Sequence, residues 1–249
     1  MMLRPLALAA ALCALTQTSV ADEASREAIR KSLAELAPNS KLGTIEPSAI
    51  PGMFEVTVDS SAVLYVSGDG RYIMQGVLFD AKEKKNLTDA RQTGLRKDLM
   101  ASVPVKDRIV FTPKDGKVKY RVAVFTDVDC GFCRKLHHEM ADYNARGIEI
   151  QYLSWPRAGQ GSDTWRKHVA IFCAKDQQET MTKAKDGVDP GNATCANPVE
   201  QEFQLGMKLG INGTPAMVFE DGTLQPGYMP PADLEARLKA AAEASAAAK

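Results

Sequence analysis

The sequence lacks an excess of charge of either sign. It contains 31 basic and 31 acidic residues, and removing an N-terminal leader that carries Arg4 leaves 30 basic against 31 acidic residues. A near-neutral chain with no block of basic residues has no electrostatic basis for binding nucleic acid or an anionic membrane. We therefore expect no nucleic acid among its partners.

Long hydrophobic runs are also missing. An apolar stretch runs from Leu6 to Leu15, and no later stretch approaches the roughly 20 residues that a transmembrane helix needs. The sequence also has no glycine-rich phosphate loop, no His-Glu metal motif and no Ser/His/Asp set with supporting context. We expect no membrane insertion and no bound metal or other cofactor.

The first 21 residues have the features of a secretory signal peptide. Arg4 supplies the positive charge, the apolar stretch follows it, and Ser19-Val20-Ala21 supplies small residues before a cut after Ala21. The leucine before Cys13 is not the small residue that a lipoprotein signal requires. The sequence therefore predicts a soluble, exported chain.

Cysteine is scarce, with five residues in the whole chain. Cys13 falls in the leader. The other four all lie in the second half, where export permits disulfides, and they are Cys130, Cys133, Cys173 and Cys195. This one-sided distribution suggests two parts with different roles.

Residues 22–87 have the pattern of one helix and a small antiparallel sheet. Apolar residues form a helical stripe over residues 24–36. Apolar or alternating runs follow at residues 53–59, 62–67 and 72–80, with a hairpin turn at Gly68-Asp69-Gly70. A unit of this size is marginal alone. We predict that it is a dimerisation domain that pairs with a second copy; a monomeric unit packed on the second half is the alternative.

Residues 88–104 predict a mostly exposed helical linker that ends near Pro104. Residues 105–249 predict an α/β domain. A strand over 120–127, a helix over 130–147 and a strand over 148–155 make a parallel βαβ unit. Two or three helices between 161 and 209, a pair of short strands turning at Asp221-Gly222 and a final helix from Pro231 complete it.

The βαβ unit contains a Cys-x-x-Cys motif at its strand-to-helix turn, which is typical of redox proteins. Cys130 should lie at the helix N-terminus, where free N–H groups favour a thiolate, and Cys133 about one turn further in. A zinc site is the alternative, but Cys173 and Cys195 are 22 residues apart and form no second close pair. His137 and His138 could complete a ligand set, although we expect solvated positions for both.

Gly131 and Phe132 separate the two cysteines and should offer close approach and an apolar contact to another chain. Arg134 and Lys135 favour a Cys130 anion, whereas Asp127 and Asp129 oppose it. Thr214-Pro215 directly precedes a strand, where a cis peptide bond would explain the proline.

The segments "FTDVDCGFC", "LGINGTPA" and "PGYMPP" resemble the DsbC/DsbG family of bacterial periplasmic disulfide isomerases, which have a thioredoxin fold. The resemblance extends from about residue 24 to 240. It implies a homodimer through residues 22–87, Cys130 as nucleophile and Cys133 as resolving thiol. It also implies a substrate-binding cis-proline loop at Thr214 and Pro215, and a structural disulfide between Cys173 and Cys195.

One departure from thioredoxin itself concerns the buried acid six residues before the first cysteine, where this chain has Val124. The proton acceptor of Cys133 is therefore not that carboxylate.

The resemblance implies mis-oxidised exported proteins as substrates and a membrane thiol reductase of the DsbD type as electron donor, with no cofactor beyond the dithiol. A dithiol oxidase, a reductase of single oxidised cysteines and a periplasmic chaperone use the same features and stay open as alternatives. The extra N-terminal module favours the isomerase, because a monomeric oxidase has no need of it.

Overall fold

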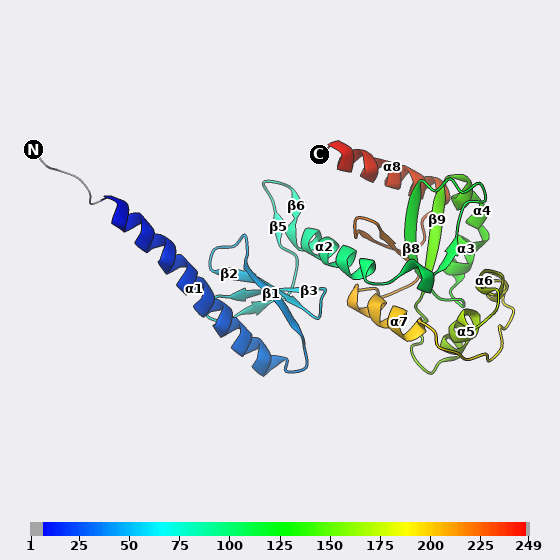
Figure 1. Ribbon diagram of the computed structural model, residues 1–249, viewed down its shortest axis with the longest axis horizontal. Helices are drawn as coiled ribbons and strands as arrows, with labels where there is room; N and C mark the ends of the chain where they lie inside the picture. Colours follow the sequence, from blue (N-terminus) through cyan, green and yellow to red (C-terminus); the bar gives the residue numbers. More distant parts are fainter. Residues whose placement is uncertain (1–6, 248–249) are drawn as a thin grey trace, which may run out of the picture. The chain divides into compact units, whose positions relative to one another are not determined.

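The computed structural model describes the backbone of residues 7–247 and the side chains of residues 22–246. The chain divides between Gln92 and Thr93 into two compact units (Figure 1). The predicted signal peptide falls on residues 1–21, whose first six residues and whose side chains lie outside this description. Its cut after Ala21 therefore stays a prediction. In the described part of the chain, no helix is both long and apolar enough to cross a membrane.

The first unit consists of a long helix on a small antiparallel sheet. The sheet has the strand order β1-β2-β3-β4, and a separate two-stranded pair follows it. Their bounds are α1 (Ala7–Leu36), β1 (Leu42–Pro47), β2 (Met53–Val58), β3 (Ala62–Ser67), β4 (Ile73–Met74), β5 (Phe79–Asp80) and β6 (Lys85–Asn86). The helix predicted over 24–36 lies within α1 and is confirmed.

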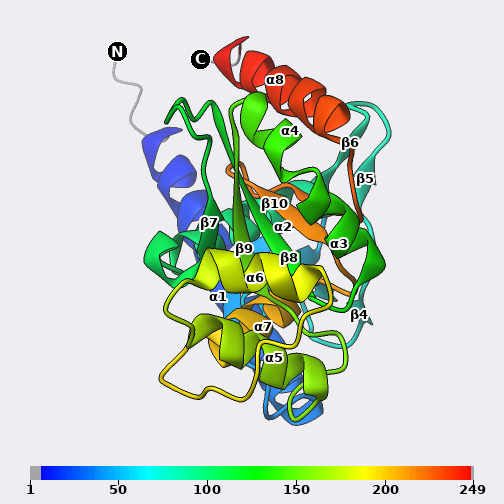
Figure 2. The ribbon, with the colours of Figure 1, turned by 90° about the vertical axis from the view of Figure 1, so that its right-hand side faces the viewer.

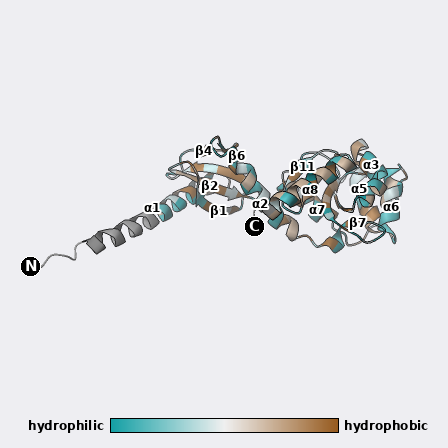
Figure 3. Ribbon diagram, turned by 90° about the horizontal axis from the view of Figure 1, so that it is seen from above, coloured by the Kyte–Doolittle hydropathy of each residue, from teal (hydrophilic) through white to brown (hydrophobic). Residues whose placement is uncertain are grey.

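The core of the first unit forms where the apolar stripe of α1 meets one face of the sheet. Ile29 and Leu33 pack with Phe54, Val56 and Val66, all of them buried. In Figure 3 the strands carry brown, hydrophobic segments, whereas the described part of α1 is largely teal outside this stripe. The helix is therefore amphipathic and stabilised by tertiary packing.

The prediction of strands in this unit was partly wrong. The hairpin at 68–70 is confirmed by the pairing of Tyr65 with Met74. The run at 72–80 is broken between β4 and β5, because the N–H of Leu78 donates to the hydroxyl of Thr88 (2.8 Å) instead of a neighbouring strand. Strand β1 was missed because its sequence, LGTIEP, has only Ile45 fully buried.

Helix α2 (Leu87–Ala101) confirms the helix predicted over 88–102. Its buried residues are Thr88 near the start and Met100 near the end. Met100 belongs to an apolar cluster of the second unit, so the end of the expected, mostly exposed linker helix is packed.

The second unit is built on a five-stranded sheet of order β11-β10-β8-β9-β7, covered by helices. Only β8 and β9 pair in parallel. The strands are β7 (Ile109–Phe111), β8 (Tyr120–Thr126), β9 (Ile148–Ser154), β10 (Ala216–Phe219) and β11 (Leu224–Pro226). The helices are η1 (Val105–Asp107), α3 (Gly131–His138), α4 (Met140–Ala145), α5 (Asp163–Phe172), α6 (Gln177–Lys185), α7 (Val199–Lys208) and α8 (Pro231–Ala247).

The central strands are buried on both faces, as alternate residues join different clusters. Val122 and Val124 lie in the cluster that also holds apolar residues of α3, α4, α6 and α8. Ala123 and Phe125 lie in the cluster with α7 and the end of α2. Figure 2 shows α3 and α6 in front of β8 and β9, and α2 behind them.

The parallel βαβ unit, the three helices between 161 and 209, the strand pair around Asp221-Gly222 and the final helix are confirmed. The helix predicted over 130–147 is divided at Glu139, which has φ −95° and ψ 13°. Hydrogen bonds from Lys135 and Tyr228 hold the Glu139 carboxylate at this break (both 2.5 Å). The short edge strand β7 was missed because three residues carry little pattern.

Candidate active site

Cys130 is the N-cap residue of α3, as the motif predicted. Strand β8 ends at Thr126, a short loop follows, and Cys130 has extended dihedral angles (φ −81°, ψ 123°) before the helix begins at Gly131. The N–H of Arg134 donates to the carbonyl of Cys130 (3.0 Å), which closes the first helical turn. The free N–H groups of this turn favour a negative charge at the Cys130 sulfur.

Both thiols of the motif are free and recessed. Cys130 is 4 % exposed and Cys133 is 1 % exposed. The rim beside them is open, because a side chain at Gly131 would meet no atom within 4 Å. Phe132 is 63 % exposed and stacks on Tyr228, with ring centroids 6.4 Å apart. A partner chain can therefore approach Cys130 across Gly131 and contact an aromatic surface.

The two thiols have opposite pKa shifts. A hydrogen bond from the Cys133 thiol lowers the pKa of Cys130 to about 5, with further support from Thr214, the N–H of Cys133 and the charge of Arg157. Burial raises the pKa of Cys133 above its usual range, and its hydrogen bond to Cys130 acts in the same direction. Near neutral pH Cys130 is therefore a thiolate and Cys133 a thiol, which is the division needed for attack followed by resolution.

The Thr214-Pro215 peptide bond is cis, as predicted. The loop lies against the motif, because the Cys130 sulfur is 3.2 Å from the carbonyl oxygen of Thr214, to which it donates when it is protonated. Strand β10 begins directly after the proline, and Ala216 pairs with Phe125 of β8. Among the described residues the buried Oγ1 of Thr214 has no hydrogen-bond partner. This hydroxyl is therefore free to donate to the Cys130 thiolate, which lowers the pKa of Cys130.

The cations expected to favour the Cys130 anion are engaged elsewhere. Arg134 donates to the carbonyl of Val128 (2.9 Å) and pairs with Asp129 (3.2 Å), while Lys135 pairs with Glu139. Arg157, in the loop after β9, supplies the positive charge that lowers the pKa of Cys130. Sequence reasoning missed it because it comes from a distant segment of the chain.

Asp127, which was expected to oppose the Cys130 anion, has both carboxylate oxygens hydrogen-bonded to other residues. Its carboxylate accepts from the backbone and side chain of Arg157 (2.8 and 3.3 Å) and from the N–H of Asp129 (2.7 Å). Asp129 is bound by Lys167 (3.0 Å). The negative charges flanking Cys130 are therefore largely neutralised.

The prediction of a solvated His137 was wrong. His137 is 5 % exposed, and its ring nitrogens lie 3.2 Å from the Tyr152 hydroxyl and 3.0 Å from the Thr182 hydroxyl. Helix α6 packs on this side of α3, and burial lowers the pKa of His137 to about 4. His138 is exposed and pairs with Asp186 (2.9 Å). Among the described residues, no cluster of three or more His, Cys, Asp or Glu could hold a metal ion.

Two further buried groups were missed. His168 accepts from the N–H of Val128 at Nε2 (3.3 Å) and contacts Ser154 at Nδ1 (2.9 Å). Lys185, the last residue of α6, is 1 % exposed. A signal for it existed in the sequence, because Lys185 follows the buried Met181 by four residues and so lies on the same helical stripe.

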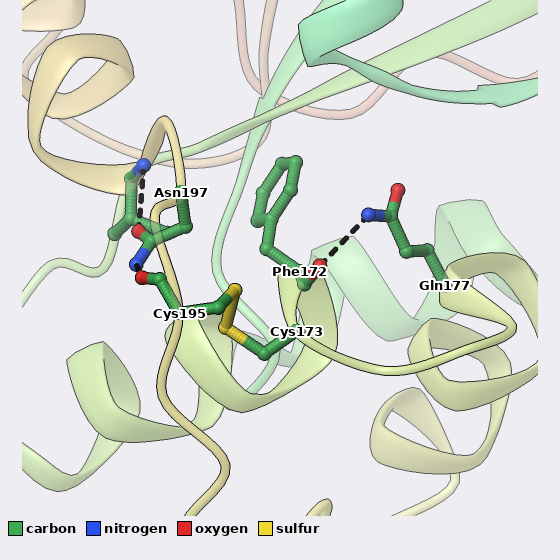
Figure 4. The surroundings of a disulfide bond; sticks show 6 residues. Phe172, Cys173, Gln177, Cys195 and Asn197 are labelled. Atoms are coloured by element: carbon green, nitrogen blue, oxygen red, sulfur yellow. Dashed lines mark hydrogen bonds between the residues drawn. A yellow bond between two sulfur atoms is a disulfide. The ribbon is translucent and has the colours of Figure 1, made fainter.

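Cys173 and Cys195 form a disulfide, as the resemblance implied. Their S–S distance is 2.07 Å and their Cα atoms are 5.7 Å apart, within the usual range. Figure 4 shows the bond joining the end of α5 to the loop before α7. Asn197 donates to the carbonyl of Cys195 and Gln177 to that of Phe172 (both 2.8 Å), so the segments on both sides are anchored.

Comparison with known proteins places these features in one family. Residues 106–242 match the family model of a thioredoxin-like domain, and residues 19–89 match that of the disulfide bond isomerase protein N-terminal domain. The chain is similar to the thiol:disulfide interchange protein DsbC of Escherichia coli K12, with 36 % identity over 226 residues and 90 % of each chain covered. For DsbC of Dickeya dadantii the identity is 37 % over 227 residues, covering 91 % of each chain.

Among solved structures, a disulfide interchange protein from Neisseria gonorrhoeae has 34 % identity and a TM-score of 0.49, covering 55 % of this chain and 97 % of that chain. The family models and the full-length relatives together confirm the resemblance inferred from the motifs. The chain belongs to the DsbC family of thiol:disulfide interchange proteins.

Proposed function

We propose that the protein is a periplasmic disulfide isomerase in which Cys130 attacks mispaired disulfides of exported proteins. The observation that carries this proposal is the pair of opposite pKa shifts, which lowers the pKa of Cys130 to about 5 and raises that of Cys133. The attacking species in disulfide exchange is the thiolate. These pKa shifts thus support Cys130 as the attacking thiolate and Cys133, within the same helical turn, as the protonated thiol that acts second.

The reaction begins when the Cys130 thiolate attacks one sulfur of a substrate disulfide. A mixed disulfide forms, and the other substrate sulfur leaves as a thiolate. This thiolate can attack a second disulfide in the substrate, and a later attack on the mixed disulfide returns Cys130 as a thiolate. The cycle moves no net electrons, so the protein ends it as a dithiol.

A stalled mixed disulfide needs the second thiol. Cys133 loses its proton and attacks the Cys130 sulfur, which releases the substrate reduced by two electrons and leaves a Cys130–Cys133 disulfide. Two electrons from a donor then restore the dithiol. We assign this step to a membrane thiol reductase of the DsbD type, as family membership suggests.

The groups that we propose bind substrate can be contacted by any loosely folded polypeptide. The backbone of Thr214 faces Cys130, and Phe132 with Tyr228 offers an exposed aromatic surface. Backbone hydrogen bonds and apolar contact recognise a peptide without reading its sequence. Thr214, Pro215, Gly131 and Phe132 are the residues that we propose contact substrate.

We propose that residues 22–87 pair two copies, that residues 88–104 link them to catalytic domains, and that residues 105–249 form those domains. Large apolar side chains are exposed around the edge strand β4, and they are Tyr72, Met74, Val77 and Phe79. Exposed apolar patches of this kind mark association surfaces. Replacing Met74 and Val77 by aspartate should halve the solution mass, whereas the same change at the exposed Val188 should not.

The double variant Cys130→Ser/Cys133→Ser tests the thiol mechanism. Refolding of a scrambled-disulfide substrate should fall to the uncatalysed rate, because no thiolate remains to attack. Suppression of aggregation of a substrate without cysteines should persist, since the aromatic rim is intact. Rescue of scrambled substrate at the full rate would refute the mechanism and favour a chaperone, and catalysed oxidation of a reduced substrate without reshuffling would favour an oxidase.

Single oxidised cysteines provide the remaining comparison. A reductase of such residues returns a sulfenic acid to a thiol and consumes both thiols of the motif in each turnover. The variant Cys133→Ser distinguishes the two activities, because isomerisation can cycle through Cys130 alone whereas net reduction needs Cys133. Complete loss of reshuffling in this variant would favour the reductase.

A further inference from the structure

Lys185 carries a buried amine next to the strand end and loop that lead into the active-site motif. Its Nζ donates to Thr126 Oγ1 (2.6 Å) and to the carbonyl oxygen of Asp127 (3.0 Å), and it lies 5.4 Å from the centroid of the Tyr152 ring. Both hydrogen-bond partners are uncharged oxygens. A lysine buried on these terms is costly in its charged form, and burial lowers its pKa.

The hydroxyl of Thr126 connects this amine to the resolving thiol. Thr126 is fully buried at the end of β8, where the strand leads into the motif, and its hydroxyl lowers the pKa of the Cys133 thiol, as a group that can donate to the thiolate does. A hydroxyl can accept one hydrogen bond while donating another. Nζ, Oγ1 and the Cys133 sulfur therefore form a continuous path along which a proton can move.

The usual position for a proton acceptor in a thioredoxin fold is apolar in this chain. Val124 is fully buried in the apolar cluster of the sheet. The carboxylate of Asp127, next to Thr126 in the chain, is already bound by Arg157 and by the N–H of Asp129. Lys185 and Cys133 influence each other directly, because Lys185 lowers the pKa of Cys133 and Cys133 raises that of Lys185.

Other ionisable groups around this pair affect the charges without forming the path. The two buried histidines, His137 and His168, have pKa values lowered to about 4 and about 3, so they are neutral near pH 7. Ionisable groups face Lys185 or Cys133 from α3 and α5, from β9, and from the loops after β8 and β9. They are Asp127, Cys130, Arg134, His137, Tyr152, Arg157 and His168.

We propose that Lys185 is the proton acceptor for Cys133. It receives the proton through the Thr126 hydroxyl and does not touch the reacting sulfur atoms itself. This rests on the proposed function, in which Cys133 resolves the mixed disulfide. In that step Lys185 acts in its neutral amine form, towards which burial shifts it. The Cys133 proton passes to Thr126 Oγ1 while the Thr126 proton passes to the lone pair of Nζ. The resulting thiolate attacks the Cys130 sulfur, the Cys130–Cys133 bond forms, and the substrate sulfur leaves with its electron pair and takes a proton from solvent.

The proton transfer creates an ammonium and a thiolate together in a site of low dielectric constant. Each charge compensates the other, so the pair is favourable where either charge alone is not. When a donor reduces the Cys130–Cys133 disulfide, Lys185 returns its proton to Cys133 by the same path. The resting dithiol thus keeps Cys133 protonated, and the reacting state can still ionise it.

The variant Lys185→Met tests this role, since an apolar side chain of similar length fills the space of the buried amine and removes the proton acceptor. A mixed disulfide of Cys130 with the chromophoric thiol 5-thio-2-nitrobenzoate reports resolution by the release of colour. Followed by stopped flow between pH 5 and 10, release should slow about tenfold at pH 7, and its midpoint should move up by about one pH unit. Lys183→Met, on the exposed side of the same helix, should match the wild type.

Substitutions at Thr126 test the path separately. Thr126→Ser keeps the hydroxyl and should retain the wild-type pH profile, whereas Thr126→Val should reproduce the shift of Lys185→Met. Near-UV circular dichroism checks that each variant is folded. A wild-type pH profile in Lys185→Met, or equal profiles for the two Thr126 variants, would overturn the proposal. Colour release from wild type that Cys133→Ser does not abolish would instead overturn the proposed role of Cys133 itself.

Discussion

The two cysteine pairs of this chain begin at opposite ends of helices. Cys130 caps the N-terminus of α3, where free N–H groups stabilise an anion. Cys173 caps the C-terminus of α5, where carbonyl oxygens oppose one, and it is bonded to Cys195 across a separation of 22 residues. The first pair has two free thiols within one helical turn. The helix end at which the first cysteine lies and the number of residues between the two cysteines thus distinguish the reactive pair from the structural pair.

The largest expected effect concerns the ionisation of the two helix-capping thiols. Alkylation of Cys130 by iodoacetamide should have a midpoint near pH 5, following its lowered pKa. In the variant Cys195→Ser the freed Cys173 should be alkylated only at a clearly higher pH than Cys130, because the carbonyl end of a helix disfavours a thiolate. Mass spectrometry of the two labelled sites at each pH measures both. If Cys173 ionised as easily as Cys130, the helix end could not explain the difference.

The double variant Cys173→Ser/Cys195→Ser should lower the free energy of unfolding by ~3 kcal/mol, because the closed loop no longer restricts the unfolded chain. The denaturation midpoint in urea measures this loss. Thiol:disulfide exchange at Cys130 should keep its rate in conditions where the variant is folded. A large fall in exchange with unchanged stability would reverse the roles assigned to the two pairs.

A third effect, smaller for each unit of pH, separates the influence of burial from that of a helix N-terminus. Glu202 lies in the first turn of α7, yet burial raises its pKa to about 8, and its Oε2 accepts from the N–H of Ser154 (2.7 Å). The folded state therefore binds a proton that the unfolded state releases above pH ~4.3, and stability should fall as pH rises from there towards 8. While only the unfolded chain has lost this proton, the free energy of unfolding should fall by ~1.4 kcal/mol for each rise of one in pH.

Glu202→Gln should flatten this pH dependence and be the more stable form at pH 9. Urea denaturation at pH 5, 7 and 9 gives the comparison, with the exposed Glu200→Gln as the matched control. An equal decline with pH in wild type and Glu202→Gln would show that burial of this carboxyl does not control the stability.

The sequence predicted the parts of the site that depend on local pattern. A strand followed by Cys-x-x-Cys and a helix placed Cys130 correctly, and a proline entering a strand predicted the cis bond at Pro215. The basic groups that act on the thiols were assigned to Arg134 and Lys135, their neighbours in sequence, whereas Arg157 and Lys185 come from other segments. Which side chain meets a thiol across a packed helix depends on tertiary contacts that no local pattern encodes.

Short elements were the other source of error. Strands β1 and β7 are held by pairing with longer neighbours rather than by their own composition. The burial of His137 likewise depends on α6, which packs over α3 from a later part of the chain. Periodicity found the long helices and central strands because these bury a whole stripe or face.

The recess around Cys130, which leaves 4 % of that residue exposed, has a consequence for which bonds the proposed isomerase can edit. A sulfur below the rim can be reached only by a substrate disulfide on a flexible segment that can extend into the recess. Correct bonds in a finished protein are rigidly held and cannot be presented in this way. The limited accessibility of Cys130 therefore selects against folded substrate proteins, whose disulfides stay intact, and in favour of incompletely folded ones, whose disulfides can react again.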